Sequence, residues 1–314
     1  MSFSQNIKDE IEKQQGQARH CRIAELAVIL YCYGQEETLD DGSKSLVVVT
    51  EHEAIVRKYF TLLKKTFNIK KGLFEGGAPC ARTNAVWEGR ILEEENYREM
   101  LEAVKMWDYE HSCFNKESRI SSVLLKTTCC KRAFLRGCYA CMGSMSDPEK
   151  GYHLEFVCNR EEMALQIQDV LAGFDLEGKI TLRRKYHVVY IKEGESIGEV
   201  LNIIEAHKGL MDFETTRVIK DVKNRVNRRS NFEAANLLKS VDKGNMQVAD
   251  ILFIQETKGL DFLPRNLQEV ALLRLEHPHE SYQELGAYLD PPIGKSGVNH
   301  RLRKIGEIAE KLRM

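Results

Sequence analysis

The sequence predicts an α+β domain built from two copies of one unit, followed by an all-helical domain. Two apolar segments that end on glycine, at Gly34 and Gly143, lie 109 residues apart. The β-rich runs that follow them are in the same register, with Leu46 and Leu154 108 residues apart. From Phe213 onward the chain is helical and basic. Self-similarity at a fixed spacing indicates a repeated structural unit.

Composition is typical of a soluble globular protein with about two domains. The 314 residues are 43% hydrophobic and 30% charged. No apolar run approaches the roughly 20 residues of a membrane span. The polar N-terminus, MSFSQNIKDEIEKQQ, lacks the apolar region of a signal peptide. We therefore expect a cytoplasmic protein that makes no membrane contact.

The cysteines indicate reduced thiols and not a disulfide framework. There are nine, an odd number, and several lie in apolar segments. Cys138 and Cys141 form a C-x-x-C, but a zinc site needs two more ligands at suitable spacing. Cys129 and Cys130 are adjacent, which is poor geometry for one small chelate loop. We expect buried small residues, no metal and no other cofactor. The full set is Cys21, Cys32, Cys80, Cys113, Cys129, Cys130, Cys138, Cys141 and Cys158.

Each repeat is predicted to run helix, strand, helix, two strands, helix, within a domain covering residues 1–212. The first repeat, about 19–107, has helices at 22–34, 52–67 and 93–105 and strands at 46–50, 69–75 and 83–91. The second, about 127–212, has helices at 133–143, 160–174 and 196–207 and strands at 152–157, 179–184 and 186–192. The alternative is that the two halves are unrelated α/β segments of similar length.

The two glycine-ended helices are expected to pack on each other at a pseudo-twofold axis. Small residues such as Gly137, Ala140 and Cys141 allow two helices to approach closely. A glycine just beyond the last turn is a favoured helix stop, because it can take the left-handed conformation. Gly34 and Gly143 are predicted to act in this way.

Residues 213–314 are predicted to form a helical domain. Two long helical patterns cover about 214–228 and 231–257. Pro264 suits the first turn of a helix that runs to about Glu276. Ser281 with Glu284 forms a capping-box pattern that opens a short helix to about residue 289. Residues 290–294, DPPIG, break that helix, and Ser296 is expected to cap a final one.

The final helix is amphipathic. Val298, Leu302, Ile305 and Ala309 fall on one face at helical spacing, and the opposite face is basic. Residues 295–304 hold four Lys or Arg residues and no acid. A short helix, a tight turn and a basic helix form a helix-turn-helix pattern, whose second helix enters the DNA major groove. A solvated face, or a surface that binds an acidic protein, would give the same charges.

The predicted DNA-binding residues belong to this region. Ser296, Asn299 and His300 are assigned to base edges, while Arg301, Arg303 and Lys304 take phosphates or guanine. Ser281 and Lys295 complete the set. Double-stranded DNA is the expected partner, the nucleoid the expected location, and no small-molecule substrate is evident.

Two further basic segments carry weaker predictions. Arg183 and Arg184, at a predicted hairpin, contact phosphate or form a solvated turn. Residues 217–229 carry a net charge of +5, and phosphate contact and partner binding both fit that segment. Its candidate residues are Lys220, Lys223, Arg225, Arg228 and Arg229.

The paired segments LAVILYCYG and LRGCYACMG resemble the two motifs of the LAGLIDADG fold of homing endonucleases. The resemblance implies a duplicated αββαββα-type domain. In active members, the acid before the final glycine of each motif holds the divalent metals that cut DNA. Here those positions are Tyr33 and Met142. A displaced endonuclease site using Glu36, Glu37 and Asp147, which lie past the helix ends, is the alternative to lost catalysis.

Nearly the whole chain resembles the WhiA family of bacterial transcription regulators. The resemblance is carried by PPIGKSGVNHRLRKI, RLEHP, MSDPEKGYHLEF, MSFSQNIKDEI and KNRVNR. It implies a degenerate LAGLIDADG domain joined to a helix-turn-helix similar to region 4 of sigma factors. It also implies a non-enzymatic regulator of sporulation, cell division or chromosome segregation. RNA polymerase, a sigma factor or another regulator would then be a partner.

Overall fold

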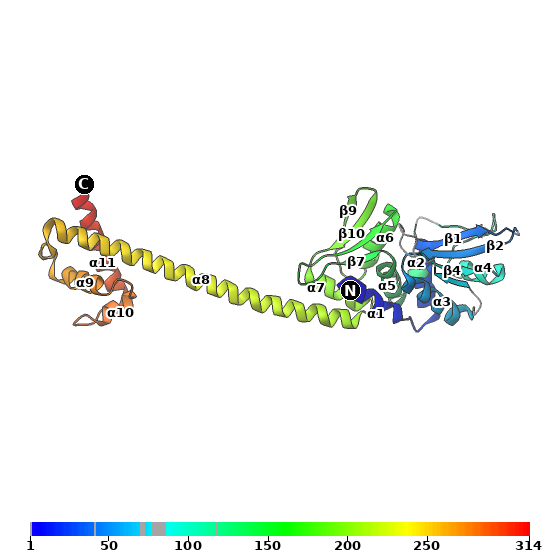
Figure 1. Cartoon of the computed structure of the whole chain (residues 1–314), viewed down its shortest axis with the longest axis horizontal. Coiled ribbons are helices and arrows are strands. Elements are labelled where there is room, and N and C mark those ends of the chain that lie inside the picture. Colours follow the sequence, from blue (N-terminus) through cyan, green and yellow to red (C-terminus); the bar gives the residue numbers. More distant parts are fainter. Residues whose placement is uncertain (1, 41, 70–72, 77–85, 117–118) are drawn as a thin grey trace. The chain divides into compact units, whose positions relative to one another are not determined.

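The computed structural model describes residues 2–40, 42–69, 73–76, 86–116 and 119–314 (Figure 1). The chain divides into two compact units, Met1–Lys220 and Asp221–Met314. Parts of the strands predicted at 69–75 and 83–91 lie outside the described residues, as does Cys80.

The two repeats of the first unit have the same order of elements. The first contains α2 (Arg19–Tyr33), β1 (Gly34–Thr38), β2 (Lys44–Thr50), α3 (Glu53–Phe67), β3 (Leu73–Gly76), β4 (Trp87–Ile91) and α4 (Glu94–Ala103). The second contains α5 (Thr128–Met142), β7 (Gly143–Met145), β8 (Leu154–Cys158), α6 (Glu161–Ala172), β9 (Lys179–Arg183), β10 (Tyr186–Ile191) and α7 (Gly194–Ile203). Between them lie β5 (Trp107–Asp108), β6 (Cys113–Phe114) and the 3₁₀ turn η1 (Ser122–Leu125).

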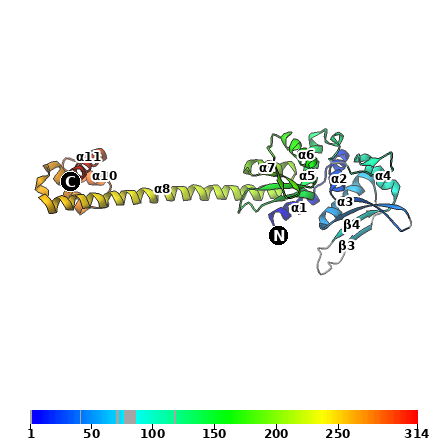
Figure 2. The same ribbon diagram turned by 90° about the horizontal axis from the view of Figure 1, so that it is seen from above.

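Each repeat forms one antiparallel sheet of four strands with the same topology. The orders are β1-β2-β4-β3 and β7-β8-β10-β9. In each, α3 or α6 packs on the two central strands (Figure 2). The predicted duplication and the α+β class are therefore confirmed.

The first strand of each sheet was not predicted. β1 pairs with β2 from Gly34 opposite Val48, and β7 pairs with β8 from Gly143 opposite Phe156. Both strands begin at the glycine that ends a central helix. Residues 35–38, QEET, are polar, so no alternation of apolar side chains marks this edge strand.

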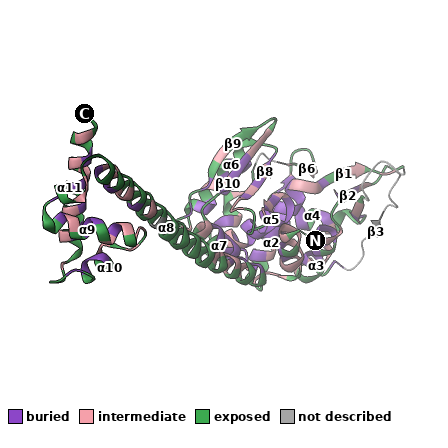
Figure 3. Cartoon of the chain, turned by 60° about the vertical axis from the view of Figure 1, so that its left-hand side comes forward, coloured by how far each residue is buried: buried purple, intermediate pink, exposed green. Residues whose placement is uncertain are grey.

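The central helices α2 and α5 pack on each other and are largely buried (Figure 3). At the crossing, a Cβ on Gly137 would lie 3.1 Å from Val28 Cβ and 3.3 Å from the Glu25 carbonyl oxygen. This contact is tighter than most real Cβ contacts, so a glycine at 137 allows the two helices to approach. The predicted close pairing of the helices is present in the structure.

The reason proposed for the two helix-ending glycines was wrong. Gly34 has φ −68° and ψ 139°, and Gly143 has φ −84° and ψ 149°, so both are extended and not left-handed. Space is the constraint instead. A Cβ would lie 2.6 Å from the Leu30 carbonyl oxygen at position 34, and 2.6 Å from Tyr139 Cα at position 143. In each repeat the chain turns directly from helix into strand at this glycine, which leaves no room for a side chain.

A buried ion network links the two repeats. Glu25 of α2 is fully buried and accepts bonds from Lys58 Nζ of α3 at 2.5 Å and from Arg136 Nε of α5 at 3.1 Å. Arg136 also pairs with the partly exposed Glu205 at 2.6 Å. Lys58 donates further to the Ile11 carbonyl oxygen at 2.6 Å. Such buried charges are tolerated only when they are paired and hydrogen-bonded.

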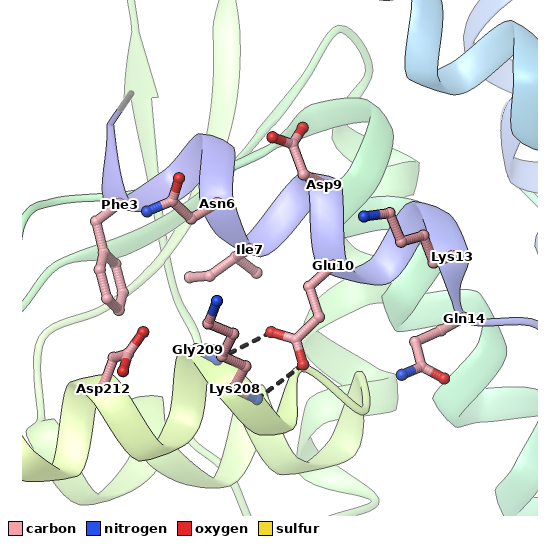
Figure 4. Close-up of a pocket in the computed structure, with 10 residues that line it drawn as sticks. All are labelled: Phe3, Asn6, Ile7, Asp9, Glu10, Lys13, Gln14, Lys208, Gly209 and Asp212. Atoms are coloured by element: carbon pink, nitrogen blue, oxygen red, sulfur yellow. Dashed lines mark hydrogen bonds between the residues drawn. The ribbon is translucent and has the colours of Figure 1, made fainter.

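An N-terminal helix, α1 (Phe3–Lys13), was not predicted, and it holds the start of α8 (His207–Lys258). The Glu10 carboxylate accepts bonds from the backbone N–H groups of Lys208, at 2.7 Å, and Gly209, at 2.9 Å (Figure 4). A groove of about 460 Å³ lies beside this contact. Glu10 satisfies donors that a helix N-terminus leaves unpaired.

The two helices predicted at about 214–228 and 231–257 are one continuous helix. α8 runs for 52 residues without a break. Its residues 221–236 are all exposed, including the apolar Val222, Val226 and Phe232, so no buried face marks continuity along this stretch (Figure 3).

The second unit packs the last part of α8 against three helices. These are α9 (Arg265–Glu276), α10 (Tyr282–Ala287) and α11 (Lys295–Arg313), with a 3₁₀ turn η2 (Leu260–Phe262). Ile251 and Ile254 of α8 join Leu267, Leu285 and Leu302 in its core. Across the described residues, no helix combines the length and apolar character needed to span a bilayer.

Candidate nucleic-acid interface

The turn between α10 and α11 is tight because it passes directly over a glycine. Ile293 donates its N–H to the Gly286 carbonyl oxygen at 3.0 Å. A Cβ at position 286 would lie only 2.1 Å from the Ile293 carbonyl oxygen. The absence of a side chain at Gly286 therefore sets how closely the loop before α11 folds onto α10.

A buried arginine organises the segment before α10. Arg274 Nη1 donates to the carbonyl oxygens of His277, Pro278 and Glu280 at 3.2, 3.2 and 2.9 Å. Burial lowers the pKa of this guanidinium from its usual value. By holding three carbonyl groups within residues 277–280, Arg274 positions the chain that leads into α10.

The capping box predicted at the start of α10 is confirmed. Ser281 Oγ accepts from the Glu284 N–H at 3.3 Å, and the Ser281 N–H donates to Glu284 Oε2 at 2.8 Å. These bonds lower the pKa of the Glu284 carboxyl. Since its backbone N–H is already used, Ser281 can offer DNA only its exposed hydroxyl.

The apolar face predicted for α11 is confirmed, but its predicted cap is wrong. Val298, Leu302, Ile305 and Ala309 are all buried. The N-cap residue is Gly294, and the helix begins at Lys295, so Ser296 lies inside the first turn. The apolar pattern fixes the helix face but not its first residue.

Most of the predicted DNA-binding residues share one exposed surface on the N-terminal half of α11. There are two exceptions. Ser281 caps α10, and Arg301 is half-buried, with its Nη1 donating to the Asn266 carbonyl oxygen at 3.2 Å. Arg303 Nε lies 3.4 Å from Glu307 Oε1 in an exposed pair, which is weak enough to exchange for another anion. The exposed residues, here called the α11 face, are Lys295, Ser296, Asn299, His300, Arg303 and Lys304.

Of the weaker candidates in the first unit, the structure places both arginines at the β9–β10 turn. Arg183 Nη1 pairs with Glu155 Oε2 at 3.1 Å. Arg184 is exposed and has φ 57°, a left-handed turn conformation. Arg183 is thus partly neutralised, whereas the Arg184 side chain makes no hydrogen bond or ion pair with the residues that the structure describes.

The basic residues of α8 differ in their surroundings. Lys220 Nζ donates to the Pro148 carbonyl oxygen at 2.8 Å and lies 5.0 Å from the Tyr152 ring centroid. Arg229 pairs with Glu233 at 2.9 Å. Lys220 is therefore engaged by the first unit. The basic residues that are exposed between Lys220 and Arg229 are Lys223, Arg225 and Arg228.

The positions at which active LAGLIDADG enzymes hold metal lie at the C-terminal ends of α2 and α5. Tyr33 Oη donates to the Cys141 carbonyl oxygen at 2.8 Å, and burial raises the pKa of this phenol. Cys158 Sγ lies 3.7 Å from Met142 Sδ. Neither Tyr33 nor Met142 supplies a carboxylate to hold a divalent ion.

A cavity of about 470 Å³ opens beside these two residues, and its basic lining was not predicted. Lys116 and Arg160 both line it, and burial lowers the pKa of Lys116. Each is isolated in the sequence, so no local charge run pointed to either. Only the fold brings them to the ends of the central helices.

The carboxylates of the alternative endonuclease site are engaged separately. Glu36 pairs with Lys44 at 2.9 Å, and Glu37 pairs with Arg90 at 2.9 Å. Asp147 accepts from the Glu149 N–H at 2.9 Å. Among the residues that the structure describes, these acids form no cluster within reach of one ion.

The second helix of a helix-turn-helix exposes a basic surface over its N-terminal half. The other domain is a duplicated α+β unit in which the two motif acids are replaced by Tyr33 and Met142. This combination defines a class of DNA-binding protein. Three family profiles match the chain. They are the WhiA N-terminal LAGLIDADG-like domain at residues 19–107, the WhiA LAGLIDADG-like domain at 131–223 and the WhiA C-terminal HTH domain at 226–309. The chain belongs to the WhiA family.

Similar proteins cover the whole chain. A probable cell division protein WhiA of Lachnoclostridium phytofermentans is 46% identical over 313 residues, covering 100% of both chains. One of Clostridium botulinum is 42% identical, covering 100% of this chain and 99% of its own. The crystal structure of full-length WhiA from T. maritima aligns with a TM-score of 0.56 and 25% identity, over 99% of both chains.

Proposed function

We propose that this protein is a sequence-specific transcriptional regulator that acts in cell division. The observation that carries the proposal is the α11 face, six exposed cationic or polar side chains on the second helix of a helix-turn-helix. The relatives named for cell division support the process. Roles in chromosome segregation and sporulation, and a location on the nucleoid, belong to the same proposal.

The residues of the α11 face have different roles in this proposal. Ser296, Asn299 and His300 lie towards the N-terminal end of the helix and contact base edges. Lys295, Arg303 and Lys304 contact phosphates, or guanine in the case of Arg303. Arg301 and Ser281 make secondary contacts, because each is already bonded within the domain.

In this proposal, residues 213–314 form the DNA-binding domain, and residues 1–212 form a catalytically inactive domain. The first domain acts as a scaffold, a second DNA contact through Arg183 and Arg184, or a docking surface for RNA polymerase, a sigma factor or another regulator. The basic residues 223–229 of α8 extend the phosphate contacts. The substituted positions Tyr33 and Met142, with the dispersed acids, support the loss of cleavage.

Electrophoretic mobility shifts with DNA selected by the wild-type protein test the proposal. The variants Asn299→Ala and His300→Ala should weaken binding to selected DNA but leave binding to random DNA nearly unchanged. Lys311→Ala, which removes an exposed cation from the last turn of the same helix, is the matched control. Equal losses for all three variants on both DNAs would contradict base readout by the α11 face.

A further inference from the structure

Four metal-binding side chains meet at the N-terminal ends of the two central helices. His20 and Cys21 belong to the first turn of α2, and Cys129 and Cys130 to the first turn of α5. One ligand atom from each lies within 4.8 Å of all the others. His20 Nδ1 is 3.0 Å from Cys130 Sγ and 3.5 Å from Cys21 Sγ. Among the described residues this is the only such group of three or more.

The repeat explains why these residues meet. His20 and Cys129 are 109 residues apart, as are Cys21 and Cys130, and this is also the spacing of Gly34 and Gly143. Each repeat thus contributes the same two positions, which the pseudo-twofold axis brings face to face. The quartet lies at the end of the helix pair opposite to Tyr33 and Met142.

The ligand set suits one tetrahedral ion. A zinc ion bound by three thiolates and an imidazole places sulfur atoms about 3.8 Å apart and sulfur and nitrogen about 3.5 Å apart. The two sulfur–nitrogen distances, 3.0 and 3.5 Å, lie near the second value, and all four ligand atoms lie within 4.8 Å of one another. Closing the quartet on an ion therefore needs side-chain movements of about 1 Å. Thiolate and imidazole ligands select zinc over magnesium or calcium, which prefer oxygen.

The surroundings also suit an ion. Cys21 and Cys130 are buried, whereas His20 and Cys129 are exposed, so the site is closed on one side and open to entry on the other. The positive ends of two helix dipoles favour thiolate ligands. Thr127 supports the cluster, with its Oγ1 3.3 Å from Cys129 Sγ and accepting from the Cys130 N–H at 3.4 Å. Such supporting contacts orient ligands.

We propose that His20, Cys21, Cys129 and Cys130 form a structural zinc site that joins the two repeats. This differs from the sequence-based expectation of no metal. That expectation rested on local spacing: Cys138 and Cys141 had no two further ligands nearby, and the adjacent Cys129 and Cys130 are poorly placed to form one small chelate loop. The remaining ligands come from the other repeat. The ion would tie the two central helices together at their N-terminal ends, through a link that depends on both repeats.

Metal content of the reduced full-length protein tests the site. The protein is loaded with zinc, dialysed and analysed by mass spectrometry for zinc per chain, then reloaded with Co²⁺ for absorption spectra. We expect one zinc per chain, and thiolate-to-cobalt charge transfer with tetrahedral d–d bands. His20→Gln and Cys129→Ser change exposed ligands and should weaken zinc binding by at least about 10-fold, since even supporting contacts are worth that much.

Cys113→Ser is the matched control, because Cys113 is a half-exposed thiol in β6 outside the quartet. It should retain zinc as the wild-type protein does, and circular dichroism should show all variants folded. Reduced wild-type protein that retains no zinc would overturn the proposal. The proposal would also be overturned if both His20→Gln and Cys129→Ser retained as much zinc as the wild-type protein. An iron–sulfur cluster bound instead of zinc would overturn it as well.

Discussion

Replacing Glu25 with Gln tests the ion network that links the two repeats. The substitution keeps the side-chain size but removes the charge. Lys58 and Arg136 are each 2% exposed. Of the described ion pairs of these two residues, only that of Arg136 with the partly exposed Glu205 would then remain. Leaving a buried charge without its partner costs about 3–5 kcal/mol. For a unit of the size of Met1–Lys220, each kcal/mol lowers the unfolding temperature by about 2–4 °C. The expected loss is therefore about 6–20 °C.

Thermal unfolding followed by circular dichroism measures this loss, and urea unfolding provides the free energy. Glu53→Gln is the matched control, since Glu53 lies at the start of α3 in an exposed i,i+4 pair with Arg57. That pair should contribute less than about 1 kcal/mol. If Glu25→Gln were no more destabilising than Glu53→Gln, the network would not be the buried, interdependent cluster described above.

Three further outcomes are expected. Arg303→Ala should weaken binding to selected DNA by about 1–3 kcal/mol if Arg303 contacts a base, and unchanged affinity in mobility shifts would refute that contact. Lys304→Ala should reduce the slope of log affinity against log salt by about 0.9, as loss of one phosphate contact requires, whereas Lys311→Ala should leave that slope unchanged. Gly286→Ala should destabilise the second unit by about 1–3 kcal/mol and lower its DNA affinity, because the new Cβ would lie only 2.1 Å from the Ile293 carbonyl oxygen. Wild-type stability of this variant in calorimetry would contradict the turn geometry.

The sequence was sufficient for the parts of the fold that a periodic pattern or a repeat encodes. The register between Gly34 and Gly143 predicted both central helices and the matching order of the units. The apolar spacing of Val298 and Leu302 predicted the buried face of α11. These features could be predicted because positions that are buried in a helix or strand carry apolar residues at the spacing of that element.

Features without such a local pattern were missed. The polar edge strand at Gly34–Thr38 has no apolar alternation, and residues 221–236 of α8 are exposed, so no buried face marks the continuity of this helix. The cap at Gly294 was assigned to Ser296, since a hydroxyl is the commoner cap.

The contacts of the candidate sites follow the same rule. The α11 face was predictable because its residues are neighbours on one helix. The engagement of Arg301 with Asn266 depends on tertiary packing. The quartet at Cys129 and Cys130 draws its other ligands from the opposite repeat, so local spacing could not reveal it.

Selection from genomic DNA is the most direct test of sequence-specific binding without cleavage. The full-length protein is incubated with fragmented genomic DNA, Mg²⁺ and excess competitor DNA at moderate salt, and the retained fragments are sequenced. We expect a few enriched sites with intact ends, which are lost in Asn299→Ala and kept in Lys311→Ala. New defined ends at the enriched sites would show that cleavage survives, and uniform retention without enrichment would contradict sequence-specific binding.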